Sequence, residues 1–153
     1  VFSRPDVRAR LIADPASIPT AVEETLRLRP PFFGFFRRAT VESTVAGVVI
    51  PEGDDVYLGW AAANRDPAVF ECPADFSLER GRNRHLSFGS GLHTCPGSRL
   101  ARMELRVCLE QVLRRLPDLE LEPGRPDYRF SGGDYAHFAT LPVRFEPKTV
   151  GDR

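Results

Sequence analysis

The sequence has no long apolar run, few cysteines and no excess of charge of one sign. A membrane-spanning helix needs about 18 or more consecutive apolar residues, and no window comes near that length, so we expect no membrane partner. The three cysteines stand at irregular spacing, which argues against a disulfide framework and favours the reducing cytoplasm. The 21 basic and 21 acidic side chains cancel, so the total charge predicts no nucleic-acid partner.

What the chain does have is enough apolar material for one domain, because 42% of its 153 residues are hydrophobic. Apolar spacing and proline breaks predict three helices, at residues 5–13, 19–28 and 98–116. Thr20 and Glu23 suit a capping box at the start of the second helix. The third helix has a broad apolar face, which predicts deep burial. That face consists of Ala101, Leu105, Cys108, Leu109, Val112, Leu113 and Leu116.

The remaining segments predict small sheets and one long irregular stretch. Residues 32–58 are rich in β-branched residues and turn signals, which indicates a hairpin or a curled sheet. Residues 64–84 carry Pro, Gly, Asn and Asp throughout, so they should be irregular, and such a segment in one domain is often functional. Strand-like runs at 128–130 and 137–145 are joined across 131–134. The predicted fold class is mainly α with small β sheets, an α+β arrangement.

The stretch from Phe88 to Gly97, FGSGLHTCPG, places a cysteine among glycines just before a predicted helix. Gly89, Gly91 and Gly97 permit turns and close approaches that other residues do not. Backbone N–H groups at a helix start stabilise an anion, so Cys95 suits a thiolate ligand or a nucleophile. A single cysteine is otherwise more often a small buried apolar residue.

Other chemistries fit this stretch less well. A cysteine-phosphatase loop needs an arginine six positions after the cysteine, where Ala101 stands, and a dinucleotide loop needs glycine in place of Thr94. A phosphate P-loop needs a Gly-Lys pair, which the sequence lacks. A zinc site stays open as a minor alternative, because its ligand types are suitable although their spacing is unusual. Its ligands would be Cys72, His85, His93 and Cys95.

The pattern Phe88-x-x-Gly91-x-x-x-Cys95-x-Gly97 resembles the haem-binding loop of the cytochrome P450 family. The resemblance implies that Cys95 is the axial thiolate ligand of the iron in haem b, and thiolate donation favours cleavage of the O–O bond. It also implies that Phe88 and the glycines, Gly89 included, contact the cofactor. Backbone amides freed by the glycines would then point at the sulfur.

Glu24 and Arg27 stand three residues apart on the second predicted helix. On an ordinary surface such a pair contributes only about 0.2–0.5 kcal/mol. In the cytochrome P450 family, however, a Glu-x-x-Arg pair is joined by a second arginine from the irregular segment, and Arg80 in FSLER matches it. The resemblance therefore implies a partly buried charge network that holds this segment and supports Cys95.

Two further residues match positions that contact the haem propionates in this family. In RRATVESTVAG, alignment on Ala39-Thr40 and Gly47 selects Arg37, whose fork suits a carboxylate. His93, two residues before Cys95, matches the second propionate donor, and a histidine there indicates a soluble bacterial type. Without the motif, each would be taken for a surface charge or a loop histidine.

The resemblance also implies a substrate pocket and an electron donor. The pocket would be lined by aromatic residues that otherwise suggest core packing, and it would take a bulky apolar substrate together with molecular oxygen. Its lining would be Phe32, Phe33, Phe36, Gly133 and Tyr135. A basic face around the cysteine loop would receive an acidic ferredoxin-type or flavodoxin-type electron donor; the alternative is a face that is merely solvated. This face would consist of Arg80, Arg82, Arg84, Arg99, Arg102 and Arg106.

By this resemblance, residues 1–153 are the C-terminal portion of a single cytochrome P450 domain, and the parent enzyme is a monooxygenase. The sequence shows no Gly-x-x-Thr helix of the oxygen-activating type, and Trp60 and Arg65 miss a Trp-x-x-x-Arg motif by one position. The alternative is a truncated, inactive product that binds haem weakly or not at all. Since the third helix would lack partners for its apolar face, we expect the isolated chain to be only marginally stable.

Overall fold

The computed structural model describes residues 3–122, 127–131 and 135–146. Within these residues the chain is mainly helical with small sheets, so the predicted fold class is confirmed. No helix in this part is both long and apolar enough to cross a membrane. The helical elements are α1 (Pro5–Ala13), η1 (Pro15–Ser17), α2 (Ile18–Leu28), α3 (Trp60–Ala63), η2 (Gly91–His93) and α4 (Ser98–Arg115).

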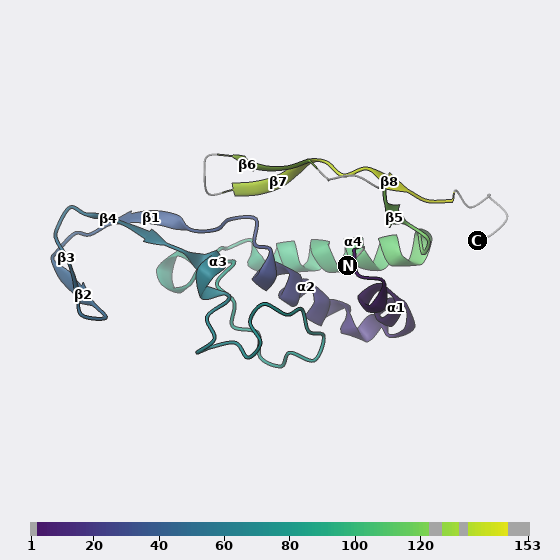
Figure 1. The fold of residues 1–153 in the computed structure, drawn as a ribbon, viewed down its shortest axis with the longest axis horizontal. Coiled ribbons are helices and arrows are strands. Elements are labelled where there is room, and N and C mark those ends of the chain that lie inside the picture. Colours follow the sequence, from purple (N-terminus) through teal and green to yellow (C-terminus); the bar gives the residue numbers. More distant parts are fainter. Residues whose placement is uncertain (1–2, 123–126, 132–134, 147–153) are drawn as a thin grey trace.

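The strands of the described residues pair as four antiparallel two-stranded sheets: β1 with β4, β2 with β3, β5 with β8 and β6 with β7. In Figure 1 the first two sheets extend to one side of the helices, while the C-terminal strands lie along α4 on the side away from α1 and α2. The strands are β1 (Phe35–Arg38), β2 (Ser43–Val45), β3 (Val48–Ile50), β4 (Asp55–Leu58), β5 (Glu120–Leu121), β6 (Asp127–Ser131), β7 (Tyr135–Thr140) and β8 (Val143–Arg144).

The first two predicted helices are confirmed, but the predicted capping box is wrong. Asp14 makes the break between α1 and α2, since its carboxylate accepts the Ala16 N–H at 3.2 Å and the Ser17 hydroxyl at 2.6 Å. The helix α2 starts at Ile18, ahead of Thr20, and its N-cap Ser17 makes no side-chain capping bond. Glu23 is bonded elsewhere, as described below.

The hydrophobic core lies where α1 and α2 pack against α4. It consists of Val7, Leu11, Ile18, Ala21, Val22, Leu26 and Leu113. The predicted deep burial of α4 is wrong for this chain, because Leu113 is the one buried residue of the helix. Leu105 and Cys108 are exposed, since α1 and α2 cover only part of the apolar face.

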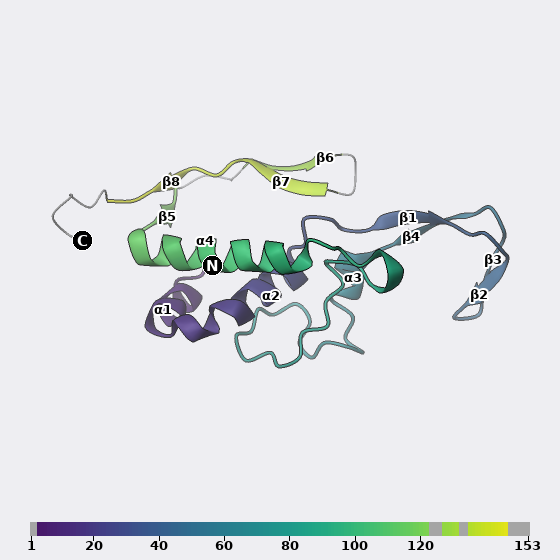
Figure 2. The ribbon, with the colours of Figure 1, turned by 180° about the vertical axis from the view of Figure 1, so that it is seen from behind.

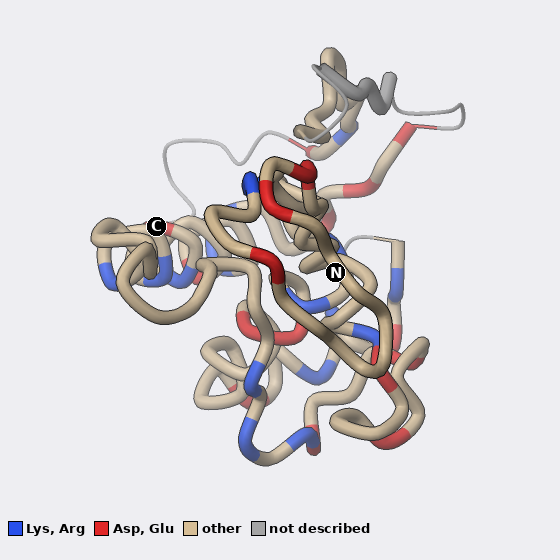
Figure 3. The backbone as a smooth tube through the Cα atoms, turned by 90° about the vertical axis from the view of Figure 1, so that its left-hand side faces the viewer, with Lys and Arg blue, Asp and Glu red and all other residues tan. Residues whose placement is uncertain are grey.

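The irregular segment is confirmed, and it follows the short helix α3, which the sequence did not predict. It loops beneath α2 and returns to the cysteine loop in both Figure 1 and Figure 2. The predicted strand at 137–145 divides at Leu141–Pro142 into β7 and β8, because proline has no N–H for a ladder. Basic and acidic positions are interspersed along the trace, in keeping with the balanced charge (Figure 3).

Candidate functional site

The cysteine loop is closed by its own backbone. The Cys95 N–H donates to the Phe88 carbonyl at 2.8 Å, and the Cys95 carbonyl accepts the Ser98 N–H at 3.2 Å. The turn η2 lies within the segment that the first of these bonds closes, and α4 begins directly after Gly97. Cys95 itself is half-buried, so the sulfur is held by an ordered loop and is not sealed in the core.

Two of the three glycines adopt backbone angles that favour glycine. Gly89 and Gly91 have φ of +69° and +70°, whereas Gly97 has an ordinary φ of −82°. A Cβ added at Gly89 would lie 3.4 Å from the His93 carbonyl oxygen and 3.5 Å from the Trp60 ring. The expected turn role is therefore observed at positions 89 and 91, while Gly97 serves as the N-cap of α4.

A pocket of about 360 Å³ opens beside this loop. It brings together Arg37 from β1, Trp60 from α3, and Gly89 and His93 from the cysteine loop. Arg38, the neighbour of Arg37, instead forms an exposed pair with Asp55 in β4, with Nε 3.0 Å from Oδ1. Adjacent strand residues face opposite sides, so only one of the two arginines reaches this pocket.

The predicted charge network forms around Glu24, whose carboxylate is fully buried. Arg27 donates Nε–H and Nη2–H to its two oxygens at 2.8 and 2.7 Å, and Arg80 donates Nε–H at 2.9 Å. Burial alone would raise the pKa of Glu24, but the hydrogen bonds from Arg27 and Arg80 hold it below its usual value. We call Glu24, Arg27 and Arg80 the meander network.

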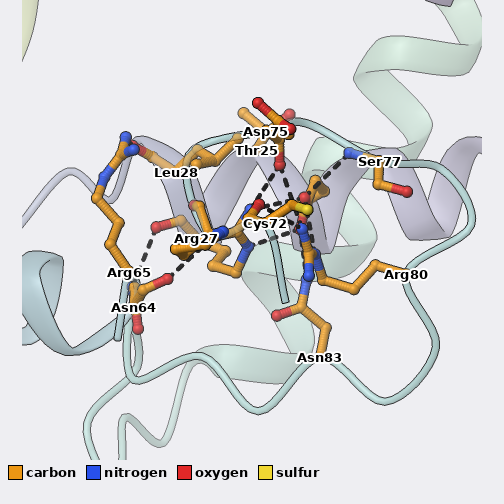
Figure 4. A network of polar contacts seen from close by, with 12 residues as sticks. Thr25, Arg27, Leu28, Asn64, Arg65, Cys72, Asp75, Ser77, Arg80 and Asn83 are labelled. Atoms are coloured by element: carbon orange, nitrogen blue, oxygen red, sulfur yellow. Dashed lines mark hydrogen bonds and ion pairs between the residues drawn. The ribbon is translucent and has the colours of Figure 1, made fainter. Parts of the chain in front are cut away.

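The meander network ties the irregular segment to α2 through backbone carbonyls. Arg27 also donates to the carbonyls of Asn64, Pro73 and Asp75 at 2.7–2.9 Å, and Arg80 donates to that of Glu71 at 2.8 Å. Figure 4 shows Arg27, Asn64 and Arg80 converging on this segment. A buried network of this kind costs several kcal/mol when one partner is removed, so it fixes the path of the chain toward the cysteine loop.

Asn64 provides a second tie that the sequence did not indicate. It is fully buried, its Oδ1 accepts the Leu86 N–H at 2.6 Å, and its Nδ2 donates to the Ser87 hydroxyl at 2.9 Å. The Ser87 hydroxyl donates in turn to the Leu26 carbonyl at 2.7 Å. The start of the cysteine loop is thereby bonded to α2.

A second charge cluster, also not predicted, joins α2 to the cysteine loop and to α4. Arg102 donates Nε–H and Nη2–H to Glu23 at 2.7 and 3.0 Å, and Nε2 of His85 lies 3.0 Å from Glu23 Oε2. Burial would raise the pKa of Glu23, but hydrogen bonds from His85 and Arg102 lower it to about 2. We call Glu23, His85 and Arg102 the loop cluster.

The structure separates the predicted substrate-lining residues. Phe32 packs on Tyr135 with ring centroids 5.0 Å apart, and a β-bridge joins the two. Phe36 packs on Tyr57 at 4.9 Å, away from that pair. Phe33 is half-buried, and Gly133 lies outside the described residues.

Phe35 and Trp60 extend the Phe32–Tyr135 pair. Phe35 lies 5.4 Å from Phe32 and 5.1 Å from Trp60, measured between ring centroids. Since Trp60 also lines the 360 Å³ pocket, the aromatic rings run from β7 to the cysteine loop.

The zinc alternative is wrong. Among the residues that the structure describes, no three His, Cys, Asp or Glu side chains converge to hold a metal ion. His85 is engaged by Glu23 and by the Ser87 N–H, and Cys72 is an exposed residue of the irregular segment.

The predicted basic face is divided between two half-buried arginines, Arg80 and Arg102, and four exposed ones. Arg80, Arg99, Arg102 and Arg106 line one pocket of about 420 Å³ between α2 and α4. Two of them are already paired with glutamates, Arg80 with Glu24 and Arg102 with Glu23. Arg82 and Arg84 are exposed on the segment before the cysteine loop.

Comparison with known proteins agrees with this geometry. The family model "Cytochrome P450" matches residues 18–146. The biotin biosynthesis cytochrome P450 of Bacillus subtilis is 40% identical over 95% of this chain, and the steroid C26-monooxygenase of Mycolicibacterium smegmatis is 39% identical over 90%. The crystal structure of P450BioI, in complex with an acyl carrier protein ligated to hexadec-9Z-enoic acid, superposes with a TM-score of 0.90 at 41% identity over 95% of the chain.

The chain spans only about a third of these relatives: 37% of the first, 34% of the second and 37% of the P450BioI chain. The matched part contains the Glu-x-x-Arg helix α2, the irregular segment, the cysteine loop and α4. With this coverage and identity, the chain belongs to the cytochrome P450 family.

Proposed function

We propose that this chain forms the haem-binding part of a haem-thiolate monooxygenase, with Cys95 as the axial ligand of the iron in haem b. One observation carries the proposal: the cysteine loop folds Gly89 and His93 against Arg37 and Trp60 around a single pocket. These residues lie up to 56 positions apart in the sequence, so only the fold brings them together.

The residues present fit a haem. A thiolate is one of the axial ligands that proteins use for haem iron, and Cys95 stands in an ordered loop. Arg37 and His93 line the same pocket and suit the two propionates, because a guanidinium fork and an imidazole both donate to carboxylates. Gly89 and Trp60 line the same pocket, and a Cβ at Gly89 would stand 3.5 Å from the Trp60 ring.

Haem bound through a thiolate supplies the activation of dioxygen, from which one oxygen atom is inserted into a C–H bond. The role of this chain is to hold the axial ligand Cys95 in place and to orient the cofactor. The meander network fixes the segment that leads into the cysteine loop, and the bond from the Cys95 N–H to the Phe88 carbonyl fixes the loop itself.

Two parts of the structure support the proposed substrate class and the proposed electron donor. The aromatic rings of Phe32, Phe35 and Tyr135 favour a bulky apolar substrate, and a relative is named for a steroid. The pocket that holds Arg99 and Arg106 favours an acidic electron-transfer protein of the ferredoxin or flavodoxin type. The free cysteines fit a reducing compartment such as the cytoplasm.

Carbon monoxide binding to the reduced, haem-loaded chain tests the proposal. We expect a strongly red-shifted Soret band that Cys95→Ala abolishes. The matched controls are Cys108→Ala and Cys72→Ala, which remove exposed thiols outside the loop and should keep the band. Loss of the band in a control but not in Cys95→Ala would contradict the assignment of the ligand.

Neighbouring arginines on β1 give a second test. Arg37→Ala should weaken haem binding by about tenfold, the equivalent of one lost charge-assisted contact of about 1.4 kcal/mol. Arg38→Ala removes the same charge one residue away. The Arg38 side chain pairs with Asp55, so its loss should not change haem binding. Equal effects of the two substitutions would contradict the propionate role of Arg37.

One observation favours a second candidate, in which this chain alone binds haem without turnover. The apolar side chains of Leu100, Met103, Leu105 and Val107 are exposed on α4. Exposed apolar faces of this kind are normally covered by other structure. Steady-state oxidation assays with a chemical reductant would decide: haem binding without product favours this candidate, and product formation excludes it.

A further inference from the structure

Arg102 occupies a place that neither the haem ligand nor the propionate contacts explain. Its guanidinium carbon stands 4.5 Å from the centre of the Phe88 ring, while Nε–H and Nη2–H donate to Glu23. Phe88 belongs to the cysteine loop, and its carbonyl accepts the Cys95 N–H at 2.8 Å. The cation of Arg102 is therefore held over Phe88, whose backbone is hydrogen-bonded to the proposed iron ligand Cys95.

The charge states of the loop cluster follow from its hydrogen bonds. His85 is almost fully buried, at 1% side-chain exposure, and its Nδ1 accepts the Ser87 N–H at 3.2 Å. In this arrangement Nδ1 accepts a hydrogen bond and Nε2 faces the Glu23 carboxylate. Glu23 is ionised, because its pKa lies at about 2, and Arg102 is always protonated.

The Glu23–Arg102 pair of the loop cluster is one anion and one cation, and the cation lies over the Phe88 ring. Cation and ring attract each other, and Glu23 partly balances the positive charge. Adding an electron to a metal centre is favoured by a nearby cation and disfavoured by a nearby anion. The two partners should consequently act on such a centre with opposite sign.

We propose that Arg102, balanced by Glu23, is a positioning residue that holds Phe88 and sets the reduction potential of the iron bound by Cys95. This inference rests on the proposed haem-binding function and adds a tuning role to residues that the ligand pattern does not include. Arg102 acts through Phe88 and does not itself touch the iron ligand.

Spectroelectrochemical titration of the haem-loaded chain tests the inference. Arg102→Gln leaves the Glu23 carboxylate unbalanced and should lower the reduced-to-oxidised ratio at fixed potential by about threefold to tenfold, where tenfold is about 59 mV for one electron. Glu23→Gln leaves the cation unbalanced and should raise the ratio by a similar factor. The reduced-to-oxidised ratio of the double variant should be close to that of the unmodified protein. Arg102→Lys keeps the charge, so its ratio should differ less from the unmodified value than that of Arg102→Gln.

A merely structural role predicts a different result. In that case both single variants would lower the melting temperature and shift the ratio in the same direction, which would overturn the proposal. The matched control is Arg106→Gln, one turn along α4, whose arginine is half exposed and pairs only loosely with Glu110 at 3.6 Å. If Arg106→Gln changed the reduced-to-oxidised ratio as much as Arg102→Gln does, the proposal would also be overturned.

The carbon monoxide spectrum separates this inference from the proposed function. If the unmodified chain gives no red-shifted Soret band, the haem-thiolate assignment is wrong and the tuning role falls with it. If the band is present in all variants and the potentials do not move in opposite directions, only the tuning role is wrong. Should one single variant fail to fold, Arg102→Lys and the double variant still decide between charge and structure.

Discussion

Glu23 and Glu24 are neighbours on α2, yet they belong to two clusters of different character. Successive residues of an α-helix point about 100° apart, so one faces the irregular segment and the other faces α4. Glu24 is fully buried within the meander network, whereas Glu23 is 26% exposed and its partner Arg102 is 39% exposed. The meander network fixes the path of the chain, whereas the loop cluster places a partly exposed ion pair beside the cysteine loop.

Removing Arg27 should have the largest effect. Arg27→Met deletes five hydrogen bonds and leaves the carbonyls of Asn64 and Pro73 without this donor. We expect the free energy of unfolding, measured with urea, to fall by about 3–5 kcal/mol, because one partner of a buried ion pair is lost.

Arg38→Met is the matched control for that substitution. It removes an arginine of similar geometry from an exposed pair with Asp55. The free energy of unfolding should stay within experimental error, since exposed pairs are screened by water and salt. If both variants lose the same stability, the distinction between a buried and an exposed network is wrong.

The second prediction concerns acid stability and the loop cluster. The pKa of Glu23 is lowered from 4.5 to about 2, so its stabilisation is fully present above pH 4.5 and is lost as the pH falls toward 2. Glu23→Gln should remove about 1–2 kcal/mol of this pH-dependent stability, a figure reduced for partial solvent exposure. Urea unfolding at several pH values measures it. Parallel profiles for the variant and the unmodified chain over this range would contradict the role of Glu23.

Two glycines with the same backbone strain, one in the pocket wall and one outside it, test whether the pocket is the haem site. Gly89 and Gly53 both have positive φ, but a Cβ at Gly53 would meet nothing within 4 Å. Each alanine substitution should cost about 1–2 kcal/mol for the left-handed backbone. Only Gly89→Ala should also weaken haem uptake, because Gly89 lines the 360 Å³ pocket and the left-handed strain there would shift the loop that forms its wall. Equal haem uptake by the two variants would show that the pocket is not the haem site.

Glu24, Arg27 and the cysteine loop were predictable because their signals are local, whereas Arg80, which lies 56 residues from Glu24, was identified only through the family resemblance. Glu24 and Arg27 are one helical turn apart, and the pattern around Cys95 fits within ten residues. The loop cluster had no such signal, since Glu23 meets His85 and Arg102 from 62 and 79 residues away. Each of its three members was given another role: a helix cap, a zinc ligand and part of a basic face.

Burial was the other property that the sequence did not determine. The apolar spacing of α4 gives its helical form and its face, but the number of elements that cover the face depends on the fold. The role of Trp60 was missed for a related reason, because its contact with Gly89 depends on where α3 places it.

Leu113 and Leu105 give a matched contrast between buried and exposed positions within α4. Leu113 packs in the core with α1 and α2, whereas Leu105 is 43% exposed two turns earlier. Leu113→Ala should lower the free energy of unfolding by about 2–4 kcal/mol, because it opens a cavity in the core. Leu105→Gln should change it by no more than about 0.5 kcal/mol, because its side chain already faces water. A loss at Leu105 as large as that at Leu113 would mean that the exposed face of α4 is covered in solution, by a second copy of the chain if the loss depends on protein concentration.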